Sequence, residues 1–437
     1  MSKEFDHDKL FKEYRDRLGP MPERPPLNIK IIYKRKMCRY EEWKIEYTAE
    51  GPDTMPEPSG QKIPAYLLIP ATYDDCKAPF PAMVCYHQCF CDCDIGKEAV
   101  VGKMVQRPDQ AYGLELVQQG FVVIAPDTWG CGERNIPSVR KEGERTTNCS
   151  HPVSLISYYK KIILEGICAV DVLQSLDCVD GTRIGAIGHS MGAHTTFIHM
   201  AYDQRIKGGI VSGFGDYQVH GLFKDYNEGL AFLCPRLFMQ FQGSYDGTQE
   251  QIQKLINAHK FAGRFYEKMN VADNLVLRIK PCHHVFIDEF KWEAYARLKE
   301  YFGIAEQTKH FFLEEVLQDA KKDLWCWEED DKKAFLNTSG KHSILGKRRI
   351  LTDAFRAMFI ILLQKRPAGG SLSVAVESDQ DRCYVVCTVL GTCEGVKSAH
   401  EYLVRSMEQG FFENSAFLRR ENTPDQVKYV VTLQKAK

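Results

Sequence analysis

The sequence predicts an α/β domain built on an open, mostly parallel sheet, followed by a small α+β module. The main observation is a series of short, almost wholly apolar runs, each followed by a turn and a helix-length segment. These runs are residues 82–86, 121–125, 183–187, 208–211, 236–241 and 275–279. Strands of this kind are typical of a parallel sheet that helices cover on both faces.

Two further patterns complete this prediction. Residues 29–37 and 43–48 alternate and are β-branched enough to be strands, and a turn-rich segment separates them from the strand 63–69. Together they predict an antiparallel start to the sheet. Residues 155–176 carry apolar side chains at intervals of three and four, which predicts a helix with one buried face. Weaker helical periodicity covers residues 251–265 and 290–301. Catalytic groups in such folds gather at the carboxyl ends of the strands.

The chain is expected to divide into three parts. Residues 1–335 would form the α/β domain with its N-terminal extension, and residues 336–347 have the composition of a linker. Residues 348–437 predict a small module of unknown function. Its expected elements are a helix at 350–364, strands at 371–377 and 382–390, a helix at 396–408 and a strand at 427–434.

Composition excludes several classes of function. The 437 residues include 57 Lys and Arg against 58 Asp and Glu, so neither a nucleic-acid partner nor a membrane anchor is expected. No secretory leader or membrane-spanning run is apparent. Many of the 16 cysteines, such as Cys85 and Cys168, lie in apolar runs that predict reduced thiols. The expected location is therefore cytoplasmic.

A candidate nucleophile lies between an apolar strand and a helix-forming stretch. Residues 188–192 read Gly-His-Ser-Met-Gly. In such a sharp strand-to-helix turn, the serine backbone is strained and the glycines relieve crowding. Ser190 would stand at a helix N-terminus, where the N–H of Met191 can receive the negative charge that develops on a carbonyl oxygen.

A serine nucleophile needs a base and an acid that orients the base. The order serine, acid, histidine is expected in this arrangement. Asp246 follows the apolar strand 236–241, although Asp216 is a rival acid after an earlier strand. Two adjacent histidines, His283 and His284, follow the strand 275–279 and leave the choice of base open.

The loop after strand 82–86 should supply the second oxyanion donor. It reads His-Gln-Cys-Phe, so the expected donor is the backbone N–H of Gln88, with Cys89 as the alternative. For His87 itself, a structural role in capping the strand end is nearly as well supported as a role in the site. Residues 89–94 hold three cysteines at alternate positions, a spacing unlike that of zinc sites, so no metal is predicted. The polar residues 135–152 are expected to form a flap over the site.

These residues together resemble the α/β-hydrolase superfamily, in its dienelactone-hydrolase-like and acetyl-xylan-esterase-like branch. The resemblance covers about residues 25–305 and rests on 81–88 with 96–98, on 125–134, and above all on 179–192. It implies an α/β-hydrolase fold, a triad of Ser190, Asp246 and His284, and no cofactor. Two departures stand out: dienelactone hydrolases proper use cysteine where this chain has Ser190, and Cys-His-His at 282–284 replaces Gly-Gly-His.

The expected function is a serine hydrolase that cleaves a small-molecule carboxylic ester or lactone through an acyl-enzyme. Three alternatives remain: a peptidase of the prolyl-oligopeptidase type, a thioesterase or acyltransferase, and a non-catalytic binding or scaffold protein on the same fold. A propeller-length N-terminal domain is absent from this sequence, which counts against the peptidase alternative. The C-terminal module leaves room for homo-oligomerisation or for a protein partner.

Overall fold

The structure is a computed structural model of the chain. It describes residues 7–37, 39–49, 62–71, 78–89, 95–104, 107–134, 155–213, 222–304, 309–322, 334–337, 341–346, 351–352, 354–356, 358–359, 362, 372–390, 407, 411, 416–423 and 426–435. Two compact units are present, Met1–Ile304 and Ala305–Lys437. They are described separately.

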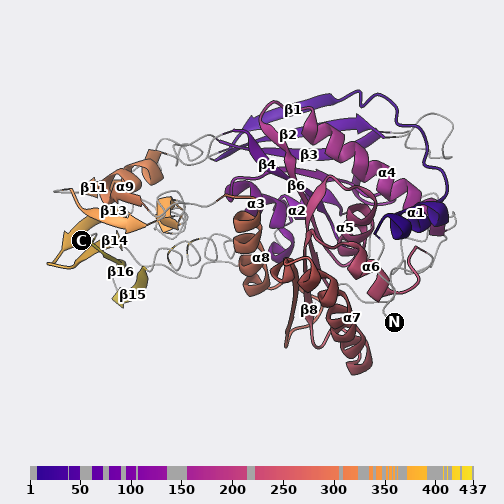
Figure 1. Ribbon diagram of the computed structural model, residues 1–437. Helices are drawn as coiled ribbons and strands as arrows, with labels where there is room; N and C mark the ends of the chain where they lie inside the picture. The colour runs from indigo at the N-terminus through magenta and orange to yellow at the C-terminus, as the bar shows by residue number, and fades with distance from the viewer. Residues whose placement is uncertain are drawn as a thin grey trace, which may run out of the picture. The chain divides into compact units, whose positions relative to one another are not determined.

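The first unit is built on a nine-stranded sheet (Figure 1). Its strands, in spatial order, are β1 (Lys30–Lys36), β2 (Tyr40–Thr48), β3 (Lys62–Pro70), β5 (Val122–Pro126), β4 (Phe80–Tyr86), β6 (Val179–His189), β7 (Ile206–Ser212), β8 (Leu237–Gly243) and β9 (Leu275–Lys280). The pairs β1–β2, β2–β3 and β3–β5 are antiparallel, and the remaining neighbours are parallel. The predicted antiparallel start and parallel remainder are both confirmed.

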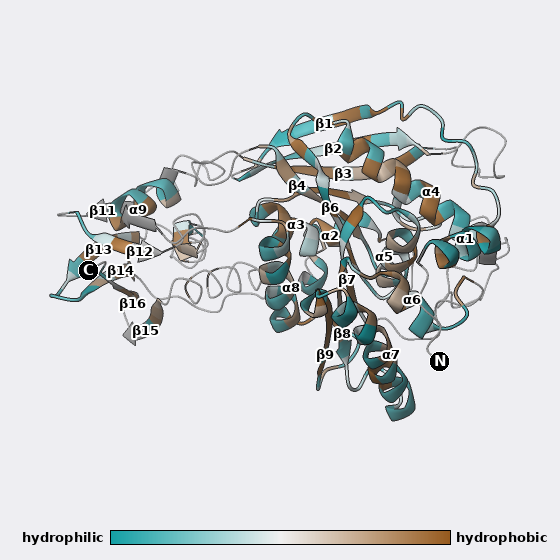
Figure 2. Cartoon of the chain, viewed as in Figure 1, coloured by the Kyte–Doolittle hydropathy of each residue, from teal (hydrophilic) through white to brown (hydrophobic). Residues whose placement is uncertain are grey.

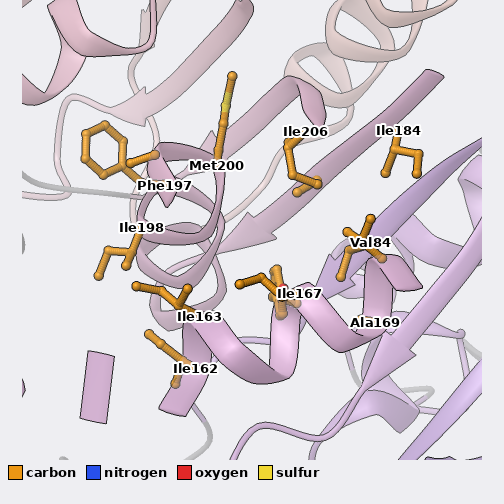
Figure 3. Close-up of a cluster of buried hydrophobic side chains, with 14 of the residues drawn as sticks. Val84, Ile162, Ile163, Ile167, Ala169, Ile184, Phe197, Ile198, Met200 and Ile206 are labelled. Carbon is orange, nitrogen blue, oxygen red and sulfur yellow. The ribbon is translucent and has the colours of Figure 1, made fainter. Parts of the chain in front are cut away.

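Helices cover both faces of this sheet. One face packs against α1 (His7–Leu18), α4 (Leu155–Gln174), α5 (Met191–Tyr202), α6 (Tyr226–Phe232) and α7 (Gln249–Lys268). Figure 3 shows Ile163 and Ile167 of α4 beside Ile198 of α5 in this core. The opposite face packs against α2 (Lys97–Val100), α3 (Tyr112–Gln118) and α8 (Asp288–Tyr301).

The two cores explain why the central strands are apolar at every position. Along β4, Val84 and Tyr86 enter one core while Met83 and Cys85 enter the other, since successive side chains point to opposite faces. Figure 2 shows the hydrophobic centre of the sheet in brown. Strand β1, at the edge, is mostly exposed and carries several lysines and an arginine, which discourage pairing with another chain.

The second unit is a five-stranded sheet with a helical cover. The strand order is β11 (Ala334–Asn337), β13 (Leu372–Ser378), β14 (Arg382–Leu390), β16 (Gln426–Gln434) and β15 (Phe417–Thr423). Helix α9 (Leu313–Lys322) presents Leu313, Val316, Leu317 and Ala320 to the same core as the alternating inward residues of the sheet. A second, two-stranded sheet pairs β10 (Lys309–Phe312) with β12 (Ser343–Gly346).

The boundary between the units differs from the prediction. The division falls after Ile304 instead of at residue 335, because the apolar stripe of α9 is buried in the second core. The predicted linker 336–347 contains the end of β11 and all of β12, whose backbone groups pair with β13 and β10. Turn-forming residues such as those at 337–340 had suggested a linker, but long-range strand pairing decides the structure here. The helix expected at 396–408 falls almost wholly outside the described residues.

Within the described part of the chain, no helix has both the length and the hydropathy needed to cross a membrane.

Candidate active site

Ser190 occupies a strained turn between β6 and α5. Its backbone has φ 56° and ψ −118°, a conformation that residues with a side chain rarely adopt. A Cβ on Gly188 would lie 2.2 Å from the backbone of Gly192, and a Cβ on Gly192 would lie 2.2 Å from the Tyr86 carbonyl oxygen. Both positions therefore require glycine, as the sequence predicted. The turn leaves Ser190 half-buried at the N-terminus of a 12-residue helix.

The predicted acid and base meet at the carboxyl ends of two neighbouring strands. Asp246 follows β8, and His284 follows β9. The Nδ1–H of His284 donates to Oδ2 of Asp246 over 2.8 Å. Because the carboxylate can only accept, this bond fixes the tautomer and leaves the lone pair on Nε2 of the imidazole. About 44% of the His284 side chain is exposed, so solvent reaches part of the imidazole.

His284 lies against the turn that carries Ser190. Its ring centroid is 4.5 Å from that of His189, the residue directly before the serine. The Ser190 N–H donates to the Ser212 carbonyl oxygen over 2.8 Å, and a Cβ on the next residue, Gly213, would lie 2.8 Å from Cε1 of His284. Strand β7 thus ends between the serine turn and the histidine, bringing the predicted residues to one place.

The alternative residues have different surroundings. His283 is exposed, and its ring centroid lies 5.5 Å from that of Tyr245. The described structure therefore couples the Asp246 carboxylate to His284. Asp216, the rival acid, lies outside the described residues, as does the expected flap 135–152.

Asp246 is held by a neighbour that sequence reasoning missed. The buried side chain of Gln242 donates its Nε2–H to the Asp246 carbonyl oxygen over 2.9 Å and to Oδ2 over 3.1 Å. Burial raises the pKa of Asp246, but the hydrogen bond and charge of His284, together with Gln242, lower it below its ordinary value. The carboxylate is ionised at neutral pH. A glutamine in an apolar strand, four residues before the acid, was the available signal.

His189 is the other unpredicted contact. It is fully buried, its Nδ1 is 3.1 Å from the Ser212 hydroxyl, and its ring lies against that of His284. Burial, and then the nearby His284, lower the pKa of His189 to about 3. The residue is therefore neutral whenever the site is at physiological pH, so it adds no positive charge beside the base.

The two expected oxyanion donors belong to neighbouring segments. Met191 is the first residue of α5. The next residue, Gly192, lies against the end of β4, since a Cβ added to Gly192 would lie 2.8 Å from the His87 carbonyl oxygen. His87 is buried; its Nδ1–H donates to the Gln88 carbonyl oxygen over 2.8 Å, and its Nε2 accepts the Thr128 N–H over 3.0 Å. His87 therefore fixes the loop that carries Gln88, in agreement with its structural interpretation.

A buried ion pair joins two of the stretches that carry the family resemblance. Lys97 and Asp127 are both inaccessible, with Nζ 2.5 Å from Oδ2, and the Lys97 N–H donates to Oδ1 over 2.9 Å. A Cβ at Gly96 or Gly132 would fall 2.1 Å or 2.3 Å from this carboxylate. These glycines thus allow the loops after β4 and β5 to close around Asp127.

Nothing in the described residues indicates a resident metal. They contain no group of three or more His, Cys, Asp or Glu side chains arranged to hold an ion. Cys91 and Cys93 of the cysteine-rich loop lie outside the described residues.

The open sheet, the strand–serine–helix turn and the acid–histidine pair at the strand ends define an α/β-hydrolase. Comparison with known families agrees. The Abhydrolase family matches residues 25–165, and the Acetyl xylan esterase family matches residues 101–318. These matches and the fold together support an α/β-hydrolase of the carboxylic-ester hydrolase class.

Individual proteins show the same likeness. A Bacillus subtilis (strain 168) protein named "Putative hydrolase YtaP" is 28% identical over 246 residues, which cover 55% of this chain and 73% of that protein. The solved structure of methylesterase BT1017 has a TM-score of 0.50 at 18% identity, covering 68% of this chain and 63% of that one. A glucuronoyl esterase from Solibacter usitatus has a TM-score of 0.49 at 15% identity, covering 68% and 91%. At these identities the structural likeness concerns the fold.

Proposed function

We propose that the protein hydrolyses short-chain carboxylic esters by a serine mechanism, with Ser190 as nucleophile, His284 as base and Asp246 as the acid that orients it. The observation that carries this proposal is the Asp246–His284 hydrogen bond beside a strained serine turn at a helix N-terminus. The match to the Acetyl xylan esterase family over residues 101–318 supports acetyl as the favoured acyl group.

In the first half-reaction, the Ser190 oxygen attacks the ester carbonyl carbon while Nε2 of His284 takes the hydroxyl proton. Asp246 stabilises the resulting imidazolium. The backbone N–H groups of Met191 and Gln88 would receive the oxyanion, where one such donor is worth about 10²–10³ in rate. His284 returns the proton to the departing alcohol, which leaves an acyl-Ser190.

In the second half-reaction, His284 takes a proton from water, and the hydroxide formed attacks the acyl carbonyl. The carboxylic acid departs when the Ser190 oxygen regains its proton from the imidazolium. The net reaction is ester plus water to acid plus alcohol, with no cofactor consumed. A half-exposed His284 is consistent with access of water to this step.

The test is hydrolysis of p-nitrophenyl acetate by the full chain and by Ser190→Ala. We expect a burst of p-nitrophenol followed by turnover, and a loss of kcat of about 10³-fold or more in the variant. A fluorophosphonate should label the peptide that contains residue 190. Ser175→Ala, at the end of α4, serves as the control and should keep full activity. Unchanged turnover in Ser190→Ala would contradict the proposal, and faster cleavage of a matched aminoacyl anilide would favour the peptidase alternative.

A further inference from the structure

A second serine, histidine and acid meet in the second unit. Nε2 of His342 lies 3.1 Å from the Ser378 hydroxyl, and Nδ1 of His342 is hydrogen-bonded to Oε1 of Glu314. The His342 N–H donates to the other carboxylate oxygen, Oε2, over 2.9 Å. These three residues are called the Ser378 cluster. They come from three separate elements, since Glu314 lies in the first turn of α9, His342 directly precedes β12 and Ser378 ends β13.

The hydrogen bonds of the cluster have a defined direction. The Glu314 carboxylate accepts from both the backbone and the ring of His342, so Nδ1 carries the proton and Nε2 presents its lone pair. The Ser378 hydroxyl is therefore the donor in the bond to Nε2. This is the order of donors that activates a serine for attack on a carbonyl carbon.

The cluster combines a supported histidine with an accessible serine. About 14% of the His342 side chain and 12% of the Glu314 side chain are exposed, whereas Ser378 is exposed. Along β13 the inward residues are Leu372, Val374 and Val376, so Ser378 continues the inward row beyond the edge of the core. The serine can therefore contact the histidine and an external molecule at the same time.

The neighbouring charges leave the cluster intact. Asp379 is engaged by the hairpin: its Oδ1 accepts the N–H groups of Asp381 and Arg382, and its Oδ2 accepts the Tyr384 hydroxyl over 2.6 Å. The Lys435 ammonium donates to the Asp379 carbonyl oxygen over 2.5 Å. A positive charge thus lies at the carbonyl oxygen of Asp379, the residue after Ser378.

We propose that Ser378 is a second nucleophilic serine, which accepts an acyl group from small carboxylic esters with the help of His342 and Glu314. The Ser378 oxygen forms a bond to the ester carbonyl carbon, and its proton passes to Nε2 of His342. The bond to the alcohol oxygen then breaks, and the alcohol leaves with that proton. The products are an acyl-Ser378 and one molecule of alcohol, with no change of oxidation state.

The test removes the first serine and maps the second. The full chain carrying Ser190→Ala is incubated with p-nitrophenyl acetate, and acetylation at each serine is followed by peptide mass mapping. We expect Ser378 to acetylate about tenfold or more faster than Ser373, an exposed serine on the same strand that serves as the internal reference. Equal rates at the two serines would overturn the proposal.

Variants of the other two residues separate activation from simple exposure. In the Ser190→Ala background, His342→Ala and Glu314→Gln should each reduce Ser378 acetylation to about the Ser373 rate, because the base or its tautomer is lost. Glu314→Gln preserves the shape of the side chain, and an unchanged thermal melting curve shows that the unit is folded. Undiminished Ser378 acetylation in a folded Glu314→Gln chain would assign the cluster a structural role only. Ser373→Ala is the matched control and should leave Ser378 acetylation unchanged.

Discussion

The Ser190 site and the Ser378 cluster use the same three kinds of side chain on very different backbones. Each has an imidazole whose Nδ1–H is held by a carboxylate, Asp246 in one and Glu314 in the other. Ser190, however, has φ 56° and directly precedes a 12-residue helix, whereas Ser378 ends an ordinary strand that turns into a hairpin. Hydrogen bonds that activate a serine can thus form in either setting.

The two sites differ in the groups that would stabilise negative charge on the carbonyl oxygen of the substrate. At Ser190 a helix N-terminus and a second loop approach the serine, and glycines allow backbone atoms to pack without a Cβ. At Ser378 the described neighbours offer one lysine at the turn. We therefore expect rapid turnover at Ser190 and slow acylation at Ser378. Nucleophile activation alone supplies only part of the rate.

The largest effect that would sharpen this comparison is expected for His284, the proposed general base of the Ser190 site. His284→Ala should lower kcat for p-nitrophenyl acetate by about 10³-fold or more, because it removes the base proposed to take the Ser190 proton. His283→Ala is the matched control, since His283 is exposed and its ring lies beside that of Tyr245. It should change kcat less than about threefold. Steady-state kinetics measure both, and the reverse ranking would transfer the role of base to His283.

An intermediate effect is expected where backbone packing positions the base. Gly213→Ala adds a Cβ 2.8 Å from His284 and 2.9 Å from His189, at φ +62°. Displacement of the imidazole should lower kcat by about 10²-fold. Gly303→Ala has a similar φ of +67° but no atom within 4 Å of the added carbon, so it isolates backbone strain.

Both glycine variants should lose about 1–2 kcal/mol of unfolding free energy from that strain, and only Gly213→Ala should also lose activity. Urea denaturation and steady-state assays measure the two effects. Equal activity in the two variants would show that the contact with His284 has no role in positioning.

The smallest effect concerns His259, a buried histidine away from the reacting groups. In the first unit, His259 is buried and bonds the neutral Gln240 over 2.8 Å, whereas His342 in the second unit faces a carboxylate. Burial lowers the pKa of His259 from 6.5 to about 3. The unfolded chain therefore binds a proton between these values that the folded chain does not, so acid favours unfolding.

His259 alone should cost about 2 kcal/mol of unfolding free energy between pH 7 and pH 5. His259→Gln keeps a neutral donor for Gln240 and should weaken this pH dependence by that amount. Denaturant unfolding of the full chain at the two pH values measures it. A pH dependence identical to that of the unchanged protein would show that His259 is not the group that titrates.

The sequence was sufficient where a local pattern carries the information. The apolar runs predicted the parallel strands, and the Gly-His-Ser-Met-Gly turn located Ser190, because strand, turn and helix are adjacent in the chain. Position relative to strand ends then indicated Asp246 and His284, which the structure brings into contact. Their catalytic roles remain the prediction that the variants above test.

Long-range pairing could not be predicted in the same way. The short strands β10, β11 and β12 are too brief to show periodicity, and they form because partners elsewhere in the chain supply hydrogen bonds. In the Ser378 cluster, His342 is 28 positions from Glu314 and 36 positions from Ser378, and no sequence motif connects the three residues. Gln242 was also missed, since its role depends on where its amide points.

The buried pairing of Lys97 with Asp127 constrains how this protein can change over time. Burial would lower the pKa of Lys97, but Asp127 and the nearby carboxylates raise it above its ordinary value, so the ammonium stays charged. Losing Lys97 alone would leave the buried Asp127 carboxylate uncompensated, at about 3–5 kcal/mol, whereas replacing both with apolar residues can be neutral. Descendants of this chain would therefore be expected to keep the two residues or to exchange them together.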